Sequence, residues 1–240
     1  MATTQCCDNP PVLNQASGKG TLVDNFGGLK AYIAGSFDAS KPAIVLVSDV
    51  FGFDAPNLRA LADKVAESGF YVVVPDFLYG DPMPPNDFSQ FPAWIQKHGT
   101  EKGYEDAKSV IKSLKEKGVS AIGAAGFCWG AKVVVELAKS GDIKAGVLLH
   151  PSFVTVDDIK EVKVPISVLG AEIDRTTPPE VVKQFEEILS GRPEVQSFVK
   201  IFPGVAHGWT VRYEVTDKAA VEKANEAHKD MLDWFTKYVK

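Results

Sequence analysis

Residues 126–130, Gly-Phe-Cys-Trp-Gly, are the part of the sequence whose types and spacing point most directly to chemistry. They follow a short apolar run, 121–125, and precede a segment with helical spacing that extends to about Lys139. A sharp strand-to-helix turn strains its middle residue, and flanking glycines let strand and helix approach closely. The helix dipole would also lower the pKa of a thiol placed there. Cys128 is therefore the predicted nucleophile; a buried structural cysteine is the alternative.

A cysteine nucleophile needs a base, and this type of turn supplies its partners in the chain order nucleophile, acid, histidine. The chain has four histidines. His98 precedes the turn and His228 lies among charges in the last helical segment, so we expect both at the surface. His150 ends the strand after the turn but precedes any candidate acid. His207, in a short turn after the last predicted strand, is the predicted base.

The acid that orients the histidine should follow the penultimate strand, 166–169, where Glu172 and Asp174 both occur. Asp174 is favoured, because its spacing before the next helix places a short carboxylate at the sheet edge, where it can fix the imidazole tautomer. An aspartate that only caps the loop is the alternative, since Asp is frequent in turns.

Two backbone N–H groups should stabilise the oxyanion that forms during attack. One belongs to Trp129, directly after the nucleophile, and the other to Val50, in the loop after the strand 43–47. Asp49 in the same loop would face the thiol and influence its ionisation, or serve only as a turn residue. Backbone donors thus complete the predicted catalytic set.

Short apolar runs and amphipathic segments alternate along the chain, which predicts an α/β fold. The buried strands are expected at 43–47, 71–74, 121–125, 145–149, 166–169 and 197–202, after a hairpin formed by 21–23 and 29–33. Helical stripes lie at 58–66, 104–114, 181–189 and 220–238. Together they predict a mostly parallel eight-stranded sheet with helices on both faces and a ligand crevice at the carboxyl ends of the strands.

Two further segments carry local signals. The helix around 181–189 should begin with a capping box at Thr177, with a proline at the first helical position, and end near Gly191. The stretch 77–91, with three prolines, is predicted to be an irregular lid or binding loop.

Composition limits the function classes. The 240 residues are 45% hydrophobic and 24% charged with a net charge of −5, typical of a globular protein without a basic surface for nucleic acid. We expect a single domain at 19–240 after a partly irregular extension at 1–18, in the cytoplasm, because no secretory signal or membrane span is evident. The adjacent Cys6 and Cys7 complete no metal site, and no cofactor motif occurs.

The sequence resembles the dienelactone hydrolase family of α/β-hydrolases from about Gly20 onward. The resemblance rests on 49–52, on 74–76 with Tyr79, on 126–132, and on the positions of Asp174 and His207. It implies the α/β-hydrolase fold and a cofactor-independent hydrolase of small esters or lactones. It also implies that Cys128, His207 and Asp174 form a triad that works through a thioester.

The departures from the family pattern concern the substrate. Asp49 stands where family members that open dienelactones carry a glutamate, and Gly80 and Asp81 stand where they place an arginine. A second arginine is shifted by one position, to Arg212. A less anionic ester or lactone is therefore expected. The predicted substrate-binding residues are Asp49, Phe51, Tyr79, His150, Phe153, Trp209 and Arg212.

Two other functions remain open from the sequence. One is a non-catalytic, small-molecule-binding relative of the same fold. The other is a β-glucan-active hydrolase, because some plant proteins that resemble this one are so described, although no opposed pair of carboxylates is evident in the sequence. The expected partner is the small-molecule substrate, without nucleic acid or membrane, and the expected state is a monomer or weak homodimer.

Overall fold

The computed structural model describes residues 10–11, 18–85 and 87–240, so Cys6, Cys7 and most of the predicted extension lie outside the described residues. In the described part, eight strands form one sheet in the order β1-β2-β4-β3-β5-β6-β7-β8. The strands are β1 (Thr21–Phe26), β2 (Leu29–Ala34), β3 (Ala43–Val47), β4 (Tyr71–Pro75), β5 (Ile122–Phe127), β6 (Ala145–Leu149), β7 (Ile166–Ile173) and β8 (Ser197–Ala206).

The sheet is antiparallel only at its beginning. β1 pairs with β2, and β2 with β4, in antiparallel register, whereas the strands from β4 through β8 run parallel. Every residue of β3, β4, β5 and β6 is buried, as their continuous apolar runs require in a sheet covered on both faces. The predicted fold class is thus confirmed.

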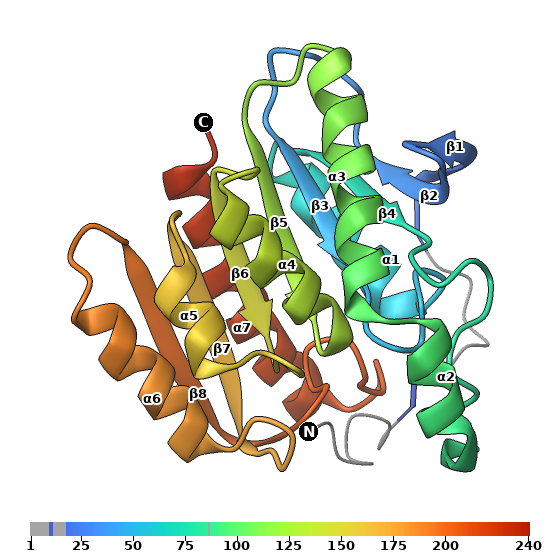
Figure 1. The fold of residues 1–240 in the computed structure, drawn as a ribbon. Coiled ribbons are helices and arrows are strands. Elements are labelled where there is room, and N and C mark those ends of the chain that lie inside the picture. Colours follow the sequence, from blue (N-terminus) through green and yellow to red (C-terminus); the bar gives the residue numbers. More distant parts are fainter. Residues whose placement is uncertain (1–9, 12–17, 86) are drawn as a thin grey trace.

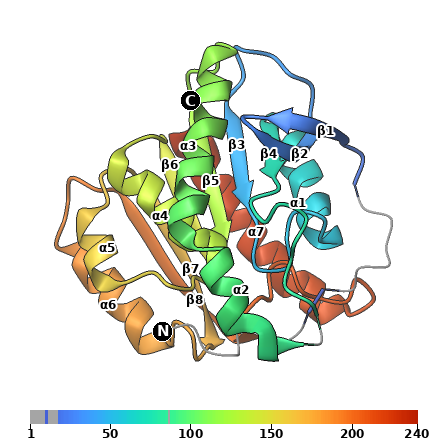
Figure 2. The ribbon, with the colours of Figure 1, turned by 45° about the vertical axis from the view of Figure 1, so that its right-hand side comes forward.

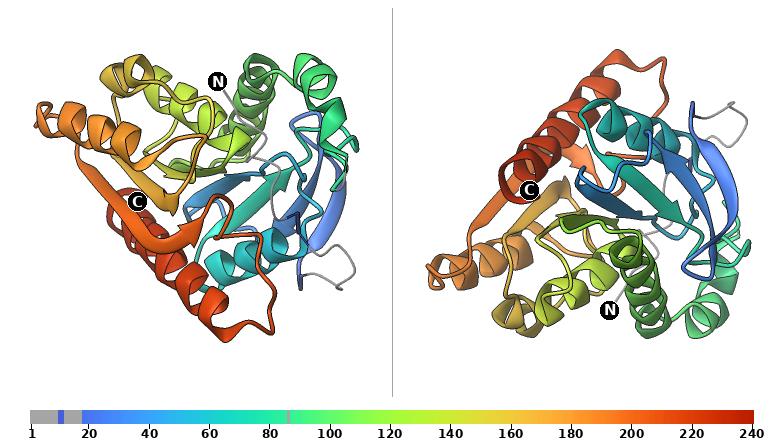
Figure 3. Two further views of the ribbon diagram at one scale, coloured as in Figure 1. Left: turned by 90° about the horizontal axis from the view of Figure 1, so that it is seen from below. Right: turned by 90° about the horizontal axis from the view of Figure 1, so that it is seen from above.

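Helices cover both faces of the sheet (Figures 1 and 2). They are α1 (Pro56–Glu67), the 3-10 turn η2 (Phe88–Gln90), α2 (Phe91–Lys97), α3 (Thr100–Glu116), α4 (Trp129–Ser140), α5 (Val156–Glu161), α6 (Pro179–Ser190) and α7 (Lys218–Tyr238). Helices α3 to α6 form the layer on one face, and α1 and α7 form the layer on the other, as the end-on views in Figure 3 show.

The last two strands are longer than their apolar runs predicted. Both continue beyond these runs, to Ile173 and Ala206, which pair with each other, and the backbone N–H of His207 donates to the carbonyl of Ile173 at 3.2 Å. β8 is the edge strand of the sheet. It tolerates Pro203, which has no backbone N–H, because an edge strand needs fewer backbone donors. Because the pairing continues to the ends of both strands, the segments that follow β7 and β8 begin next to each other.

Some local predictions were wrong. Helix α6 does have a proline at its first position, but its N-cap is Pro178 without a side-chain bond. The hydroxyl of Thr177 donates instead to the carbonyl of Pro151 at 2.7 Å, because this loop packs against the segment after β6. Two helices were not predicted from the sequence. One is α5, which begins with a capping box at Thr155, and the other is α2, at the end of the predicted lid.

No helix within the described residues is long and apolar enough to cross a membrane. The longest weakly polar stretch of the sequence, 119–138, contributes to β5 and α4.

Candidate active site

Cys128 occupies the turn between β5 and α4 with φ of 53° and ψ of −109°, a conformation that costs about 1 to 3 kcal/mol for a residue with a side chain. The glycines on either side explain how the turn closes. A Cβ at Gly126 would overlap the backbone of Gly130, and a Cβ at Gly130 would overlap the carbonyl of Val47 on β3. The structure therefore has the strained strand-to-helix turn that the sequence predicted.

Asp174 and His207 meet where β7 and β8 end. The Asp174 Oδ2 atom lies 2.7 Å from Nδ1 of His207, and both side chains are 1% exposed. The other carboxylate oxygen, Oδ1, accepts the backbone N–H groups of Thr176 at 2.8 Å and Thr177 at 3.1 Å. The loop thus fixes the carboxylate, and the carboxylate fixes the ring so that Nε2 is the nitrogen left for the thiol.

The charge state of His207 follows from its neighbours. Burial alone would lower its pKa, but the negative charge of the Cys128 sulfur and the hydrogen bond to Asp174 outweigh burial and raise the pKa to about 9. An imidazolium with this pKa stays protonated at neutral pH. Protonation of His207 and ionisation of the Cys128 thiol are therefore coupled, and each favours the other.

The two expected oxyanion donors lie in anchored segments. Trp129 is the first residue of α4, where a backbone N–H has no acceptor within its own helix, and its indole Nε1–H donates to the carbonyl of His98 at 2.9 Å. Val50 is fully buried after β3, and its carbonyl accepts the N–H of Met83 at 2.8 Å.

Asp49 forms a buried ion pair with Arg212. The Arg212 Nε–H donates to Oδ2 of Asp49 at 2.7 Å, and the two side chains are 0% and 3% exposed. Asp49 also accepts the backbone N–H of Phe51 at 2.9 Å, and the guanidinium lies 4.7 Å from the centre of the Phe51 ring. Both charged residues that the sequence assigned to substrate binding are thus already engaged with each other.

His150 lies directly beside His207. Its ring centre is 5.1 Å from that of His207 and 5.4 Å from that of Trp209, and its Nε2 pairs with the hydroxyl of Thr210 at 2.7 Å. Burial, together with the positive charge of His207, lowers the pKa of His150 well below its usual value. The ring is therefore neutral at physiological pH.

Tyr79 lies apart from this group. It is 51% exposed, its hydroxyl donates to Asp106 on α3 at 2.7 Å, and it lines a separate cavity of about 250 Å³ with His98 and Lys102. Phe153 is half-buried and packs against the core on the face covered by α3 to α6.

The prediction of two surface histidines was wrong. His98 is buried, with Nε2 2.8 Å from a carboxylate oxygen of Asp81 and its ring 4.7 Å from that of Trp94. His228 is buried in α7, where its Nε2–H donates to the carbonyl of Thr210 at 2.8 Å and burial lowers its pKa to about 4. Their hydrogen-bond partners, Asp81 and Thr210, lie 17 and 18 positions away in sequence, so the immediate polar neighbours were misleading.

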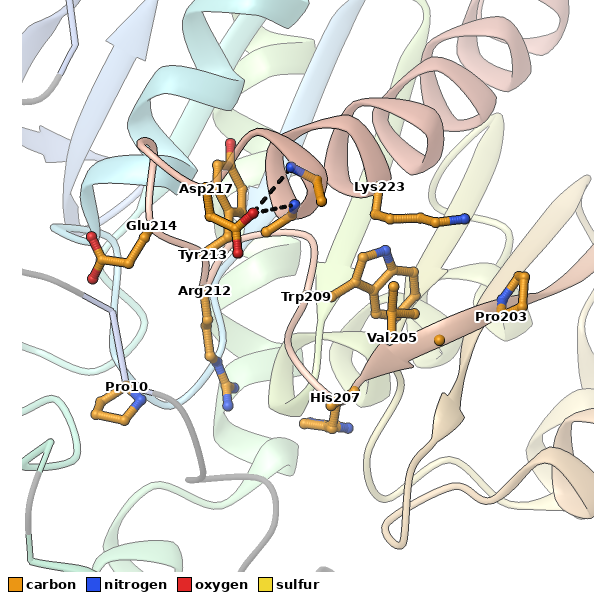
Figure 4. A pocket seen from close by; sticks show the side chains of 14 residues that line it. Pro10, Pro203, Val205, His207, Trp209, Arg212, Tyr213, Glu214, Asp217 and Lys223 are labelled. Carbon is orange, nitrogen blue, oxygen red and sulfur yellow. Dashed lines mark hydrogen bonds between the residues drawn. The ribbon is translucent and has the colours of Figure 1, made fainter.

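A cavity of about 710 Å³ opens beside His207 (Figure 4). His207, Trp209, Arg212 and Pro10 are among the residues that line it. The volume lies within the range of small-molecule sites. Within the described ranges, no three or more His, Cys, Asp or Glu side chains gather as a metal site would require.

Sequence reasoning missed Ser152. Its hydroxyl oxygen lies 3.3 Å from Sγ of Cys128, and both residues are fully buried. The only signal was position, since Ser152 comes shortly after the strand that neighbours β5 at the carboxyl edge of the sheet.

A model of the dienelactone hydrolase family matches residues 29–239. The chain belongs to the dienelactone hydrolase family. Carboxymethylenebutenolidase homolog of Xenopus tropicalis is 35% identical over 88% of both chains. The maize protein named endo-1,3;1,4-beta-D-glucanase is 47% identical over 81% of this chain, which spans 64% of the maize protein's length.

A solved structure supports the same fold. The putative dienelactone hydrolase from Klebsiella pneumoniae superposes with a TM-score of 0.73 over 91% of this chain and 98% of the other, at 21% identity. The predictions of the dienelactone hydrolase family and of a hydrolase are thus confirmed. The roles of the individual site residues stay predictions.

Proposed function

We propose that this protein hydrolyses small esters or lactones through a Cys128-His207-Asp174 triad and a thioester intermediate. The observation that carries the proposal is the buried 2.7 Å bond between Asp174 and a His207 whose pKa the Cys128 sulfur helps to raise to about 9. A histidine oriented by a buried carboxylate can take the proton of a neighbouring thiol and later return it, which is what a cysteine nucleophile needs.

The proposed steps use only groups at this edge of the sheet. The Cys128 thiolate attacks the carbonyl carbon, and the backbone N–H groups of Trp129 and Val50 stabilise the resulting oxyanion. As the carbon–oxygen bond breaks, the His207 imidazolium gives its proton to the leaving alkoxide and a thioester forms. Neutral His207 then takes a proton from water as the water attacks the thioester, which releases the acid and restores the thiolate.

The preferred substrate carries little negative charge. A carboxylate on the substrate would need an open cation beside His207, and Arg212, which borders the cavity there, is already paired with Asp49 at 2.7 Å. Lys223, the other cation on the lining, lies 3.8 Å from a carboxylate oxygen of Glu226. The apolar wall that includes Trp209 suits an uncharged acyl or lactone ring. We therefore expect neutral lactones and short aryl esters to be better substrates than dienelactone, which bears a carboxylate.

Hydrolysis of p-nitrophenyl acetate and of a neutral lactone, compared between the parent protein and Cys128→Ala, tests this function. We expect Cys128→Ala to reduce turnover at least about a thousandfold, since the remaining groups have no nucleophile to activate. Cys6→Ser with Cys7→Ser is the matched control and should leave turnover unchanged. Equal turnover by parent and Cys128→Ala would contradict the proposal. Saturable binding without turnover by the parent would support the non-catalytic alternative.

The maize relative gives β-glucan hydrolysis as a second candidate. Glycosidases need two carboxyl groups about 5 to 10 Å apart, one of them free to act as an acid. Here Asp174 is held by His207 and by two backbone N–H groups, and Asp49 is held by Arg212. Release of reducing sugar from mixed-linkage β-glucan by Cys128→Ala would favour this second function.

A further inference from the structure

Ser152 contacts the sulfur that performs the proposed attack. Its hydroxyl lies 3.3 Å from Sγ of Cys128, its backbone N–H donates to the carbonyl of Cys128 at 3.0 Å, and both residues are fully buried. One residue thus holds the nucleophile through both its side chain and its backbone.

The backbone around Ser152 is strained in a way that fixes this contact. His150 and Phe153 on either side have φ of 36° and 63°, and neither is a glycine. Each such residue costs about 1 to 2 kcal/mol and persists only where the surroundings impose it. The carbonyl of Pro151 accepts the hydroxyl of Thr177 at 2.7 Å, which ties the segment to the loop of Asp174.

We propose that Ser152 is a further catalytic residue, whose hydroxyl donates a hydrogen bond to the Cys128 thiolate and holds Sγ in position for attack. This inference rests on the proposed function. A sulfur that has given its proton to His207 has only acceptor capacity, so the hydroxyl must be the donor. A hydrogen bond to a charged atom in a buried site stabilises that atom's ionised form. Ser152 therefore favours the thiolate and restricts the direction in which it points.

Ionisation of the Cys128 thiol tests this role without any substrate. In a Cys6→Ser, Cys7→Ser background Cys128 is the only cysteine, so thiolate absorbance near 240 nm and the rate of iodoacetamide alkylation against pH report on it alone. We expect Ser152→Ala to raise the pH of half-ionisation by about 1 to 2 units, which is the worth of a hydrogen bond to a charged group. The alkylation rate should converge with the parent rate at high pH.

Three variants separate the contact from a general structural effect. Ser152→Thr keeps the hydroxyl and should titrate like the parent, whereas Ser152→Gly removes it and should titrate like Ser152→Ala. Ser167→Ala removes a fully buried hydroxyl from β7 and is the matched control, expected to leave the titration unchanged. Circular dichroism checks that each variant is folded.

None of these variants replaces another ionisable group at this edge of the sheet: Asp174 after β7, His207 and Arg212 between β8 and α7, His150 after β6, and Asp49 after β3. Coincident titration curves for the parent and the folded Ser152→Ala or Ser152→Gly protein would overturn the role of Ser152. That result would leave the proposed function intact, because the function depends instead on loss of ester hydrolysis in Cys128→Ala.

Discussion

Two buried carboxylates lie at the carboxyl edge of the sheet and bind different kinds of partner. Asp174 after β7 binds His207, and Asp49 after β3 binds Arg212; each contact is 2.7 Å, and no side chain of the four is more than 3% exposed. Each carboxylate also accepts at least one backbone N–H from its own loop. The contact distance and the burial are therefore nearly the same in the two pairs.

The chemistry of each pair depends on the partner of its carboxylate. An imidazole gains and loses a proton near neutral pH, whereas a guanidinium does not lose its proton in proteins. The pair of Asp174 and His207 can therefore take part in proton transfer. The pair of Asp49 and Arg212 is a fixed charge pair whose removal on one side leaves an unpaired buried charge. The first pair should govern rate, and the second should govern stability.

The largest expected effect is a loss of turnover when the pair of Asp174 and His207 is changed. Asp174→Asn keeps the shape of the side chain but replaces the acceptor that orients His207, so kcat for an aryl ester should fall about 10³- to 10⁴-fold. Steady-state kinetics with a circular dichroism check measures this. A fall of less than tenfold in a folded protein would contradict the assignment of Asp174. Glu172→Gln, at the exposed acid two residues earlier, is the matched control and should retain the parent rate.

Breaking the pair of Asp49 and Arg212 is expected to lower the stability of the protein. Arg212→Met leaves the Asp49 carboxylate buried without its cation and should lower the free energy of unfolding by about 3 to 5 kcal/mol, measured by urea denaturation. The double variant with Asp49→Asn removes the unpaired charge and should recover part of this loss. If the double variant is no more stable than Arg212→Met alone, the pair is not coupled as described.

The smallest expected effect is a dependence on pH, which the pair of Asp174 and His207 should show and the pair of Asp49 and Arg212 should not. Because the pKa of His207 is raised to about 9, its imidazolium form and the stability it contributes are fully present below about pH 6.5 and are lost as pH rises through 9. The value of kcat/KM should accordingly decline about tenfold per unit above pH 9. In Asp174→Asn this decline should begin at lower pH, since one of the interactions that raise the pKa is gone. An alkaline limb near pH 6.5 in the parent would contradict the ion pair.

The features that sequence could predict are those encoded in short segments. All six predicted strands appear as apolar runs, and the turn at Cys128 appears because two glycines flank one cysteine between a strand and a helix. The prediction that all six are buried was wrong for β8, which is mostly exposed or half-buried because it is the edge strand of the sheet. The positions of Asp174 and His207 follow from strand order alone, because parallel strands end at one edge.

The features that sequence could not predict depend on contacts between distant segments. Asp49 and Arg212 are 163 positions apart, and nothing local marks either as the other's partner. His228 has charged neighbours in sequence but points its ring at the carbonyl of Thr210. Ser152 lies in an ordinary loop sequence, and nothing local marks the contact between its hydroxyl and the thiol of Cys128.

The central claim, that Cys128 carries the acyl group, is tested most directly by trapping the intermediate. A slowly hydrolysed aryl ester is mixed with the protein, quenched in acid within milliseconds to seconds, and analysed by intact and peptide mass spectrometry. We predict one acyl group per chain, on the peptide with Cys128, labile to hydroxylamine as a thioester and absent from Cys128→Ala. Turnover with the acyl group on any other residue, or with an unchanged adduct in Cys128→Ala, would contradict the account.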